Sequence, residues 1–285
     1  MRRILTLLLL AGCLSSAIAD PIRAMSWNIR YFNLRDGIDA WPNRKDWAAD
    51  LINRTKPDII GLQEVVQRQM TDLKKGLKDY DAYGVGRDDG KTKGEYAPIF
   101  YRRDRFQVLE KSTFWLSKTP DKVGSRDWDA AITRIASWVR LKDRTSGQKL
   151  LFVNTHFDHR GSTARLESAR LLRRRLQSTF ADHDVILTGD FNAMPTAPPI
   201  VALTQKTKDE PRWFDARGLS KTKYTGPNST WCGFRAVEPG RRIDYIFVTE
   251  GVEVIRHNTI DEQMNGRFPS DHLPVVAEIQ LPKSN

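Results

Sequence analysis

Short apolar runs alternate with segments of helical periodicity along most of the chain. Apolar side chains recur at steps of three and four residues over Ser162–Phe180, which predicts the longest helix there, through Leu166, Ala169, Leu172, Leu176 and Phe180. Two further helices are expected at 41–55 and 67–77. Apolar runs bounded by turn residues predict strands at 23–29, 59–62, 80–85, 97–101, 106–111, 136–141, 149–155, 185–188, 244–248, 253–257 and 275–280.

This interleaving of strands and helices predicts a mixed α/β fold with sheets covered by helices. The 285 residues are 40% hydrophobic and 28% charged, which is ordinary for a globular protein. No repeat or internal linker is visible, so residues 20–285 are expected to form a single domain. No apolar run approaches the roughly 18 residues that cross a bilayer, which excludes a multispanning membrane protein. The two cysteines exclude a disulfide-rich scaffold and a four-cysteine zinc site.

The first residues have the pattern of an export signal. Arg2 and Arg3 precede the apolar run 4–11, and small residues then lead to Ala17-Ile18-Ala19. A basic start, a short apolar core and this ending are typical of a secretory signal peptide, predicted here at residues 1–19. Its removal would take two arginines with it and lower the formal net charge from +11 to +9. The mature protein is then periplasmic or secreted.

A second interpretation of the same segment stays open. Leu10-Ala11-Gly12-Cys13 resembles the sequence at which bacterial lipoproteins are modified, so that Cys13 would carry a lipid anchor and the signal would end before it. The protein would then be a membrane-anchored lipoprotein. In either case Cys232 is the one other cysteine. An exported domain with one unmodified cysteine has no internal disulfide, so its stability must come from its core or a bound metal.

Polar side chains follow several of the predicted strands at the point where each strand ends. Strand ends on one edge of an α/β sheet converge on a crevice where ligands bind. Carboxylate and amide oxygens there suit a hard cation such as Mg²⁺. Any one of these residues alone is typical of a turn or a helix cap, so it is their combination that indicates a site. The polar positions are Asn28, Glu64, His156, Asp190 with Asn192, and Asp271-His272.

Six ordered motifs resemble the endonuclease/exonuclease/phosphatase superfamily. The resemblance spans residues 23–281, and six motifs in order are specific where one would not be. It implies a four-layer α/β sandwich, with two mixed sheets packed face to face and flanked by helices. It also implies Mg²⁺- or Mn²⁺-dependent hydrolysis of a phosphoester. The motifs are Ser26-Trp27-Asn28, Gln63-Glu64-Val65, Asn154-Thr155-His156, Gly189-Asp190-Phe191-Asn192-Ala193, Arg242-Ile243-Asp244-Tyr245-Ile246-Phe247 and Ser270-Asp271-His272-Leu273-Pro274-Val275.

The resemblance also implies which residues hold the metal. Glu64 would be the principal ligand, with Asn28 beside it. Asp271 would contribute directly or through a water molecule. A bound divalent cation suits phosphoester hydrolysis because it neutralises the phosphoryl oxygens and orients the attacking water.

The remaining motif residues carry the catalytic roles that the resemblance implies. His272 would act as general base or as a group that neutralises the phosphate, with Asp244 holding its other ring nitrogen. Asp190 and Asn192 would orient the nucleophile and a non-bridging oxygen. His156 would stabilise the negative charge that develops.

Several substrate classes remain open from the sequence. Beyond the shared motifs the chain resembles an exported bacterial branch of the superfamily, and the guanidinium groups of Arg30, Arg87 and Arg134 are candidates to clamp a phosphate. The leading expectation is an exported metal-dependent phosphodiesterase, and nucleic acid is one candidate substrate, since a charge of +9 attracts polyanions. The alternatives are a phosphomonoesterase of sugar or inositol phosphates, a phospholipid phosphodiesterase and a catalytically silent polyanion-binding module. A monomer without an obligate protein partner is expected.

Overall fold

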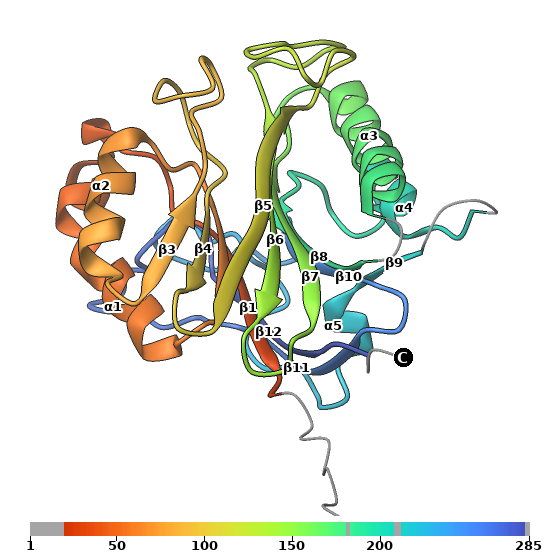
Figure 1. Ribbon diagram of the computed structural model, residues 1–285. Coiled ribbons are helices and arrows are strands. Elements are labelled where there is room, and N and C mark those ends of the chain that lie inside the picture. Colours follow the sequence, from red (N-terminus) through yellow and green to blue (C-terminus); the bar gives the residue numbers. More distant parts are fainter. Residues whose placement is uncertain (1–19, 181–182, 208–211, 283–285) are drawn as a thin grey trace, which may run out of the picture.

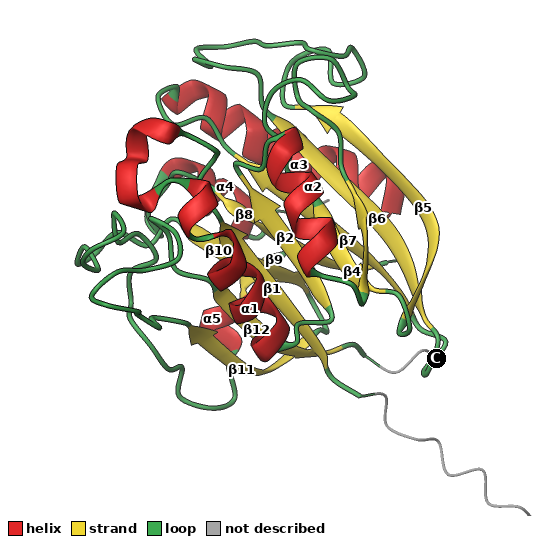
Figure 2. Ribbon diagram, turned by 90° about the vertical axis from the view of Figure 1, so that its left-hand side faces the viewer, coloured by secondary structure: helices red, strands yellow, loops and turns green. Residues whose placement is uncertain are grey.

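The computed structural model describes residues 20–180, 183–207 and 212–282. Two mixed six-stranded sheets stack face to face, with helices on their outer faces (Figures 1 and 2). This confirms the predicted four-layer α/β sandwich. The predicted signal peptide and the lipid-modification site at Cys13 lie outside the described residues.

The first sheet has the strand order β11-β12-β1-β2-β4-β3. Only β1 and β2 run parallel, and the other neighbours are antiparallel. Helices α1 and α2 cover its outer face (Figure 1). The bounds are β1 Ile22–Asn28, α1 Lys45–Thr55, β2 Ile59–Gln63, α2 Gln67–Gly76, β3 Tyr80–Tyr83, β4 Ile99–Arg102, β11 Glu253–Thr259 and β12 Val275–Gln280.

The second sheet has the order β5-β6-β7-β8-β10-β9, and again one pair, β7 and β8, is parallel. Helices α3 and α4 cover its outer face. No helix in the described ranges is both long and apolar enough to cross a membrane. The bounds are β5 Phe106–Trp115, β6 Ile135–Asp143, β7 Lys149–His156, α3 Ser162–Phe180, β8 Asp184–Asp190, α4 Pro198–Thr204, β9 Trp213–Asp215, α5 Ala216–Leu219 and β10 Asp244–Thr249.

Where the elements differ from the sequence prediction, local chemistry explains the difference. The helix expected from residue 41 begins with a 3₁₀ turn, Trp41–Asn43, because Pro42 fits the first turn of a helix, and a second 3₁₀ turn, Leu34–Asp39, precedes it. Strand β5 is longer than predicted because it is an edge strand whose middle is exposed and polar. Its pairing with β6, rather than apolar alternation, defines its length. The short elements α4, β9 and α5 were not predicted.

The core has three main apolar layers, one between the sheets and one under each helical layer. Strands of both sheets contribute to the central layer, among them Ala24 and Ile59 from the first and Phe152 and Ile246 from the second. Removal of these side chains from water is the main force that holds the two sheets together.

A polar layer joins the two sheets just below the ends of β2 and β7. Asn154 donates from Nδ2 to the backbone carbonyl of Leu62 (2.7 Å) and accepts at Oδ1 from Gln63 (2.7 Å) and Thr188 (3.0 Å). The sheets approach so closely here that a Cβ atom on Gly61 would lie 2.1 Å from Oγ1 of Thr188. Gln63 and Asn154, both in the sequence motifs, are therefore structural residues.

Gly61→Ala is expected to destabilise the protein by about 1–3 kcal/mol because the added methyl group overpacks this layer. The free energy of unfolding in urea would measure the change. Gly218→Ala is a control, since no heavy atom lies within 4 Å of its added Cβ. Equal stabilities for both variants would contradict this account of the sheet contact.

Candidate active site

The predicted site residues meet at one end of the two stacked sheets. Strands β1, β2, β7 and β8 end there, and the antiparallel β10 and β12 begin there. In the second sheet His156 pairs with Asp190 across β7 and β8, and Asp190 pairs with Asp244 across β8 and β10. Three catalytic candidates thus lie side by side on neighbouring strands.

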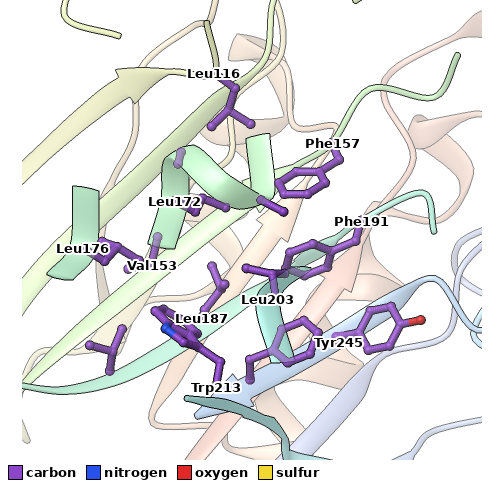
Figure 3. Close-up of a cluster of buried hydrophobic side chains, with 14 of the residues drawn as sticks. Leu116, Val153, Phe157, Leu172, Leu176, Leu187, Phe191, Leu203, Trp213 and Tyr245 are labelled. Atoms are coloured by element: carbon purple, nitrogen blue, oxygen red, sulfur yellow. The ribbon is translucent and has the colours of Figure 1, made fainter. Parts of the chain in front are cut away.

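Each of these three residues is followed by an aromatic side chain that is buried in the core. Phe157, Phe191 and Tyr245 pack under α3 and α4 (Figure 3). The rings of Phe157 and Phe191 make an edge-to-face contact with centroids 4.8 Å apart, and the hydroxyl of Tyr245 donates to the carbonyl of Ala193 at 2.8 Å. These anchors fix the strand ends, so the polar residue before each anchor is held in place.

His272 lies between two carboxylates. Its Nδ1 is 2.9 Å from Oδ2 of Asp244, and its Nε2 is 3.7 Å from Oδ2 of Asp190. Burial alone would lower the pKa of His272, but the charges of Asp244 and Asp190 outweigh burial and raise that pKa to about 10. Burial and the neighbouring Asp244 raise the pKa of Asp190 to about 7. The geometry is that of an imidazole oriented by a carboxylate, as predicted.

His156 also has a polar side chain near each of its ring nitrogens, although its nearest carboxylate at Nδ1 is farther away than that of His272. Nδ2 of Asn192 lies 3.0 Å from its Nε2, and Oε2 of Glu95 lies 4.0 Å from its Nδ1. Burial, reinforced by the charges of Arg134 and Arg87, lowers the pKa of His156 well below its usual value near 6.5. Because the amide nitrogen of Asn192 can only donate, Nε2 of His156 accepts this hydrogen bond.

Glu64 and Asp271 line the same cavity as His156, Asp190 and His272, and the fully buried Asn28 lies beside Glu64. Nδ2 of Asn28 donates to Oε1 of Glu64 at 3.1 Å and to Oδ2 of Asp190 at 3.0 Å, so it links these two carboxylates. The backbone N–H of Tyr31 donates to Oε2 of Glu64 at 3.1 Å. Burial raises the pKa of Asp271, and the charge of Glu64 raises it further.

Three site residues have a left-handed backbone. The φ angles are +62° at Glu64, +46° at Asn192 and +56° at Arg30. None of these is glycine, and each such position costs on the order of 1–3 kcal/mol. Strain of this kind is typical of functional sites, where the fold holds a side chain in a direction it would not otherwise take.

The residues of this site fit a divalent cation. Several carboxylates line one cavity, and burial raises the pKa of both Asp190 and Asp271. A bound cation would favour the ionised form of these groups. Oxygen donors of Glu64, Asn28 and Asp271 suit a hard ion. Asp190, Asp244 and His272 form a second group whose ligand atoms lie within 4.8 Å of one another. We favour the all-oxygen group, because hard cations such as Mg²⁺ prefer carboxylate and amide oxygens to an imidazole nitrogen.

The three arginines predicted to bind phosphate differ in their surroundings. Arg30 and Arg134 line the site cavity, whose volume is about 490 Å³. Arg30 forms a two-pronged ion pair with Asp36. Arg87 forms a two-pronged ion pair with Glu95 and is not among the residues that line the cavity. The prediction that Arg87 binds substrate thus gains no support from its position.

Arg134 is the arginine best placed for an anion. It is buried, its Nη2 contacts Nδ1 of His159 at 3.1 Å, and its Nη1 makes no hydrogen bond within the described residues. Its Nε lies 3.6 Å from a carboxylate oxygen of Asp158. Arg134 therefore lines the cavity as a buried guanidinium that keeps an unpaired donor in the described part of the chain.

Sequence reasoning missed two residues that shape the site. Glu95 is not among the site residues predicted from the sequence, because only the folded chain brings its carboxylate to 4.0 Å from Nδ1 of His156. Arg44 lies in the segment 41–55, for which the sequence predicts only a helix and no role in the site. A fully buried arginine just before α1 has no periodic signal, although an arginine among apolar neighbours at a helix start is an unusual placement.

Arg44 ties together the loops that carry the metal-site residues. Its guanidinium donates to the backbone carbonyls of Ile29, Arg30, Asp39 and Pro269. The first two follow Asn28 along the chain, and Pro269 precedes Asp271. Burial lowers the pKa of Arg44 to about 10, so the side chain stays charged at neutral pH.

Arg44→Met is expected to lower the free energy of unfolding by about 3 kcal/mol, because the apolar side chain leaves these buried carbonyls without a donor. Denaturation in urea measures the effect, and Mg²⁺ titration should show weaker binding. Arg54→Met is the matched control, since Arg54 is exposed and makes only surface ion pairs. A loss no larger than that of Arg54→Met would show that Arg44 does not hold the loops.

Stacked sheets with carboxylate, amide and imidazole groups around one cavity define the class of a divalent-metal-dependent phosphoesterase. The chain belongs to the Endonuclease/Exonuclease/phosphatase family, whose model matches residues 25–272. The protein is accordingly a hydrolytic phosphoesterase, and its family depends on divalent metals.

Proteins that are similar to this chain differ in the activities that their names state. A family member from Bacteroides vulgatus is 39% identical, with a TM-score of 0.88 over 92% of this chain and 100% of its own. A mannosyl-6-phosphatase from Bacteroides thetaiotaomicron is 37% identical, with a TM-score of 0.85 over 90% and 99%. Nocturnin from Drosophila melanogaster is 26% identical over 94% of this chain, which spans about half (48%) of that protein.

Proposed function

We propose that the protein is an exported phosphatase that removes a terminal phosphate from a phosphorylated carbohydrate with the help of Mg²⁺ or Mn²⁺. The observation that carries this proposal is a single cavity in which cationic side chains lie among the carboxylates of the metal site. Arg134, Arg30 and His272 line one cavity of about 490 Å³, where a phosphate monoester dianion needs its charge neutralised. The 37% likeness to a mannosyl-6-phosphatase supports the same substrate class.

In this proposal the chain's own residues bind and orient the reactants. When bound, the metal neutralises phosphoryl oxygens and lowers the pKa of a coordinated water. Glu64, Asn28 and Asp271 would hold it. A water oxygen bonds to phosphorus as the bond from phosphorus to the sugar oxygen breaks, and the proton that the water loses is returned to that sugar oxygen, so that no net proton is gained or lost. The products are inorganic phosphate and a neutral carbohydrate.

The catalytic side chains have distinct parts in this reaction. Asp190 and Asn192 orient the attacking water and a phosphoryl oxygen, and His156 donates a hydrogen bond as charge develops. His272, held by Asp244, contacts the phosphate from the opposite side. Arg134 supplies its unused donor to a phosphoryl oxygen.

Cleavage of a phosphodiester in nucleic acid is the second candidate. Its support is sequence similarity to Nocturnin and to a fungal Ccr4 exoribonuclease subunit, at 26% and 24% identity. A nucleic-acid strand, however, requires cationic groups along a track rather than at one point. This favours the monoester.

A substrate panel separates the two candidates. The purified protein would be assayed with Mg²⁺, Mn²⁺ or EDTA against mannose 6-phosphate, p-nitrophenyl phosphate, bis-p-nitrophenyl phosphate and DNA and RNA oligonucleotides. We expect metal-dependent phosphate release from the two monoesters and at least about a hundredfold less cleavage of the diesters. Preferred cleavage of the diester or the oligonucleotides would overturn the phosphatase proposal, as would no turnover of any substrate.

Export is proposed on the N-terminal pattern alone. After expression of the full chain in a Gram-negative host, the mature N-terminus is expected at Asp20 in a soluble periplasmic fraction. A lipid-modified Cys13 in the membrane fraction would show the lipoprotein alternative instead. An intact Met1 in the cytoplasm would contradict both.

A further inference from the structure

A second hollow adjoins the catalytic cavity. Its volume is about 840 Å³, and it shares four lining residues with the first, namely His159, Asn192, Arg241 and Ile243. Its walls come from three segments: the start of α3, the connection from β8 to α4, and the loop that precedes β10. We call this hollow the leaving-group groove, because a substituent attached to a phosphate in the cavity would extend into it past Asn192.

The walls of the leaving-group groove are mostly apolar and weakly charged. Met194, which is 54% exposed, lies with Leu166 and three prolines along it. The two arginines on its walls already have partners: Arg165 donates to the backbone carbonyl of Asp158, and Arg241 pairs with a glutamate and stacks on a tryptophan ring. Among the residues that the structure describes, no lysine lines either hollow.

These properties select against a polyanion. A nucleic-acid strand needs several uncommitted cations spaced along its backbone and aromatic faces for its bases. In the groove the guanidinium of Arg241 lies 3.9 Å above the ring of Trp231 and occupies that face. A neutral, amphipathic substituent has no such need, and carbohydrate has both apolar C–H faces and hydroxyl groups.

We propose that the leaving-group groove binds the sugar units that follow the phosphorylated residue of an oligosaccharide. This inference rests on the proposed phosphatase function and narrows its substrate class from sugar phosphates to phosphorylated glycans. The volume of the groove, about 840 Å³, is consistent with several sugar units. Hollows of roughly 300–1,000 Å³ hold ligands considerably larger than one sugar ring. Binding energy from these remote sugars can be used to lower the barrier at phosphorus.

The comparison of a short and a long substrate tests the groove. Full-length mature protein with Mg²⁺ would be assayed for phosphate release from mannose 6-phosphate and from a mannotriose that carries a 6-phosphate on its terminal residue. We expect kcat/KM to be at least about tenfold higher for the trisaccharide. The ratio of the two values is the quantity to follow in variants.

Two substitutions would each place a bulky side chain in the groove, one from α3 and one from the connection between β8 and α4. Met194→Trp and Thr163→Trp are both at solvent-accessible positions, so neither disturbs the core. Each is expected to reduce the trisaccharide-to-monosaccharide ratio to within about twofold of one. Val201→Trp is the matched control: Val201 is 44% exposed on α4 and does not line the groove, so its ratio should equal that of the unmodified protein.

The possible results of these assays distinguish the groove proposal from the phosphatase proposal. Equal kcat/KM values for the two sugars in the unmodified protein would overturn the groove proposal while leaving the phosphatase proposal standing. So would a faster reaction with dodecyl phosphate than with the trisaccharide, which would indicate an alkyl chain as the occupant. No phosphate release from any of these substrates would overturn the phosphatase proposal.

Discussion

Glu64→Gln should reduce metal-dependent hydrolysis at least about a hundredfold. The amide has nearly the volume of the carboxylate, so the fold and the left-handed backbone at residue 64 are retained while the negative charge is lost. Among the ligand candidates, Glu64 is held by donors on both oxygens, from Asn28 and Tyr31. A carboxylate positioned by two donors is a preorganised ligand, and its loss weakens the attraction for a hard cation.

The measurement is the rate of phosphate release over a Mg²⁺ titration, with direct calorimetric titration of the metal. Loss of a ligand should shift the metal dependence to higher concentration as well as lower the maximal rate. Glu110→Gln serves as control, since Glu110 pairs with Arg140 on the exposed part of β5. A normal rate with an unshifted metal dependence would show that the ion is held elsewhere, with the Asp190, Asp244 and His272 group as the next candidate.

Asp244→Asn is expected to lower kcat by about a thousandfold, within the range of about 10²–10⁴ that general acid–base groups supply. Oδ2 of Asp244 lies 2.9 Å from Nδ1 of His272 and fixes the orientation of that ring. An amide removes the negative charge that stabilises the protonated ring and holds it in place. KM should change little, because His272 contributes mainly in the transition state.

A double variant tests whether Asp244 acts through His272. Asp244→Asn combined with His272→Ala should be no slower than His272→Ala alone, since the carboxylate has no ring left to orient. Asp184→Asn, at the opposite end of β8 from Asp190, should keep normal activity. Fully additive losses would mean that Asp244 acts independently, for example as a metal ligand.

Much of the site was predictable because its residues follow recognisable strands. The runs that end at Asn28, Gln63, His156 and Asp190 are buried strands, and their order in each sheet brings their ends together. The roles assigned to these residues stay predictions until the variants are measured. The helix at Ser162–Phe180 was predicted with its bounds, because its apolar face is continuous.

Other features of the fold and the site could not be predicted, because they depend on contacts between segments that are far apart in the sequence. The length of β5 follows from its pairing with β6, since an exposed edge strand carries no apolar alternation. Arg44 was missed because its structural role depends on hydrogen bonds to four backbone carbonyls that come from segments far apart in the chain. Glu95 was missed for the same reason, since only the folded loop brings it within 4.0 Å of His156.

The sequence by itself determined the family, the α/β class and the identity of the residues at the strand ends, because short-range patterning specifies strands and motif residues recur in order. Only the tertiary structure decided that Arg134 rather than Arg87 lines the cavity with an unused donor, and that a weakly charged groove continues beyond Asn192. The physical reason is that ion pairs and hollows depend on the distance between segments far apart in the chain. Local sequence patterns do not encode those distances.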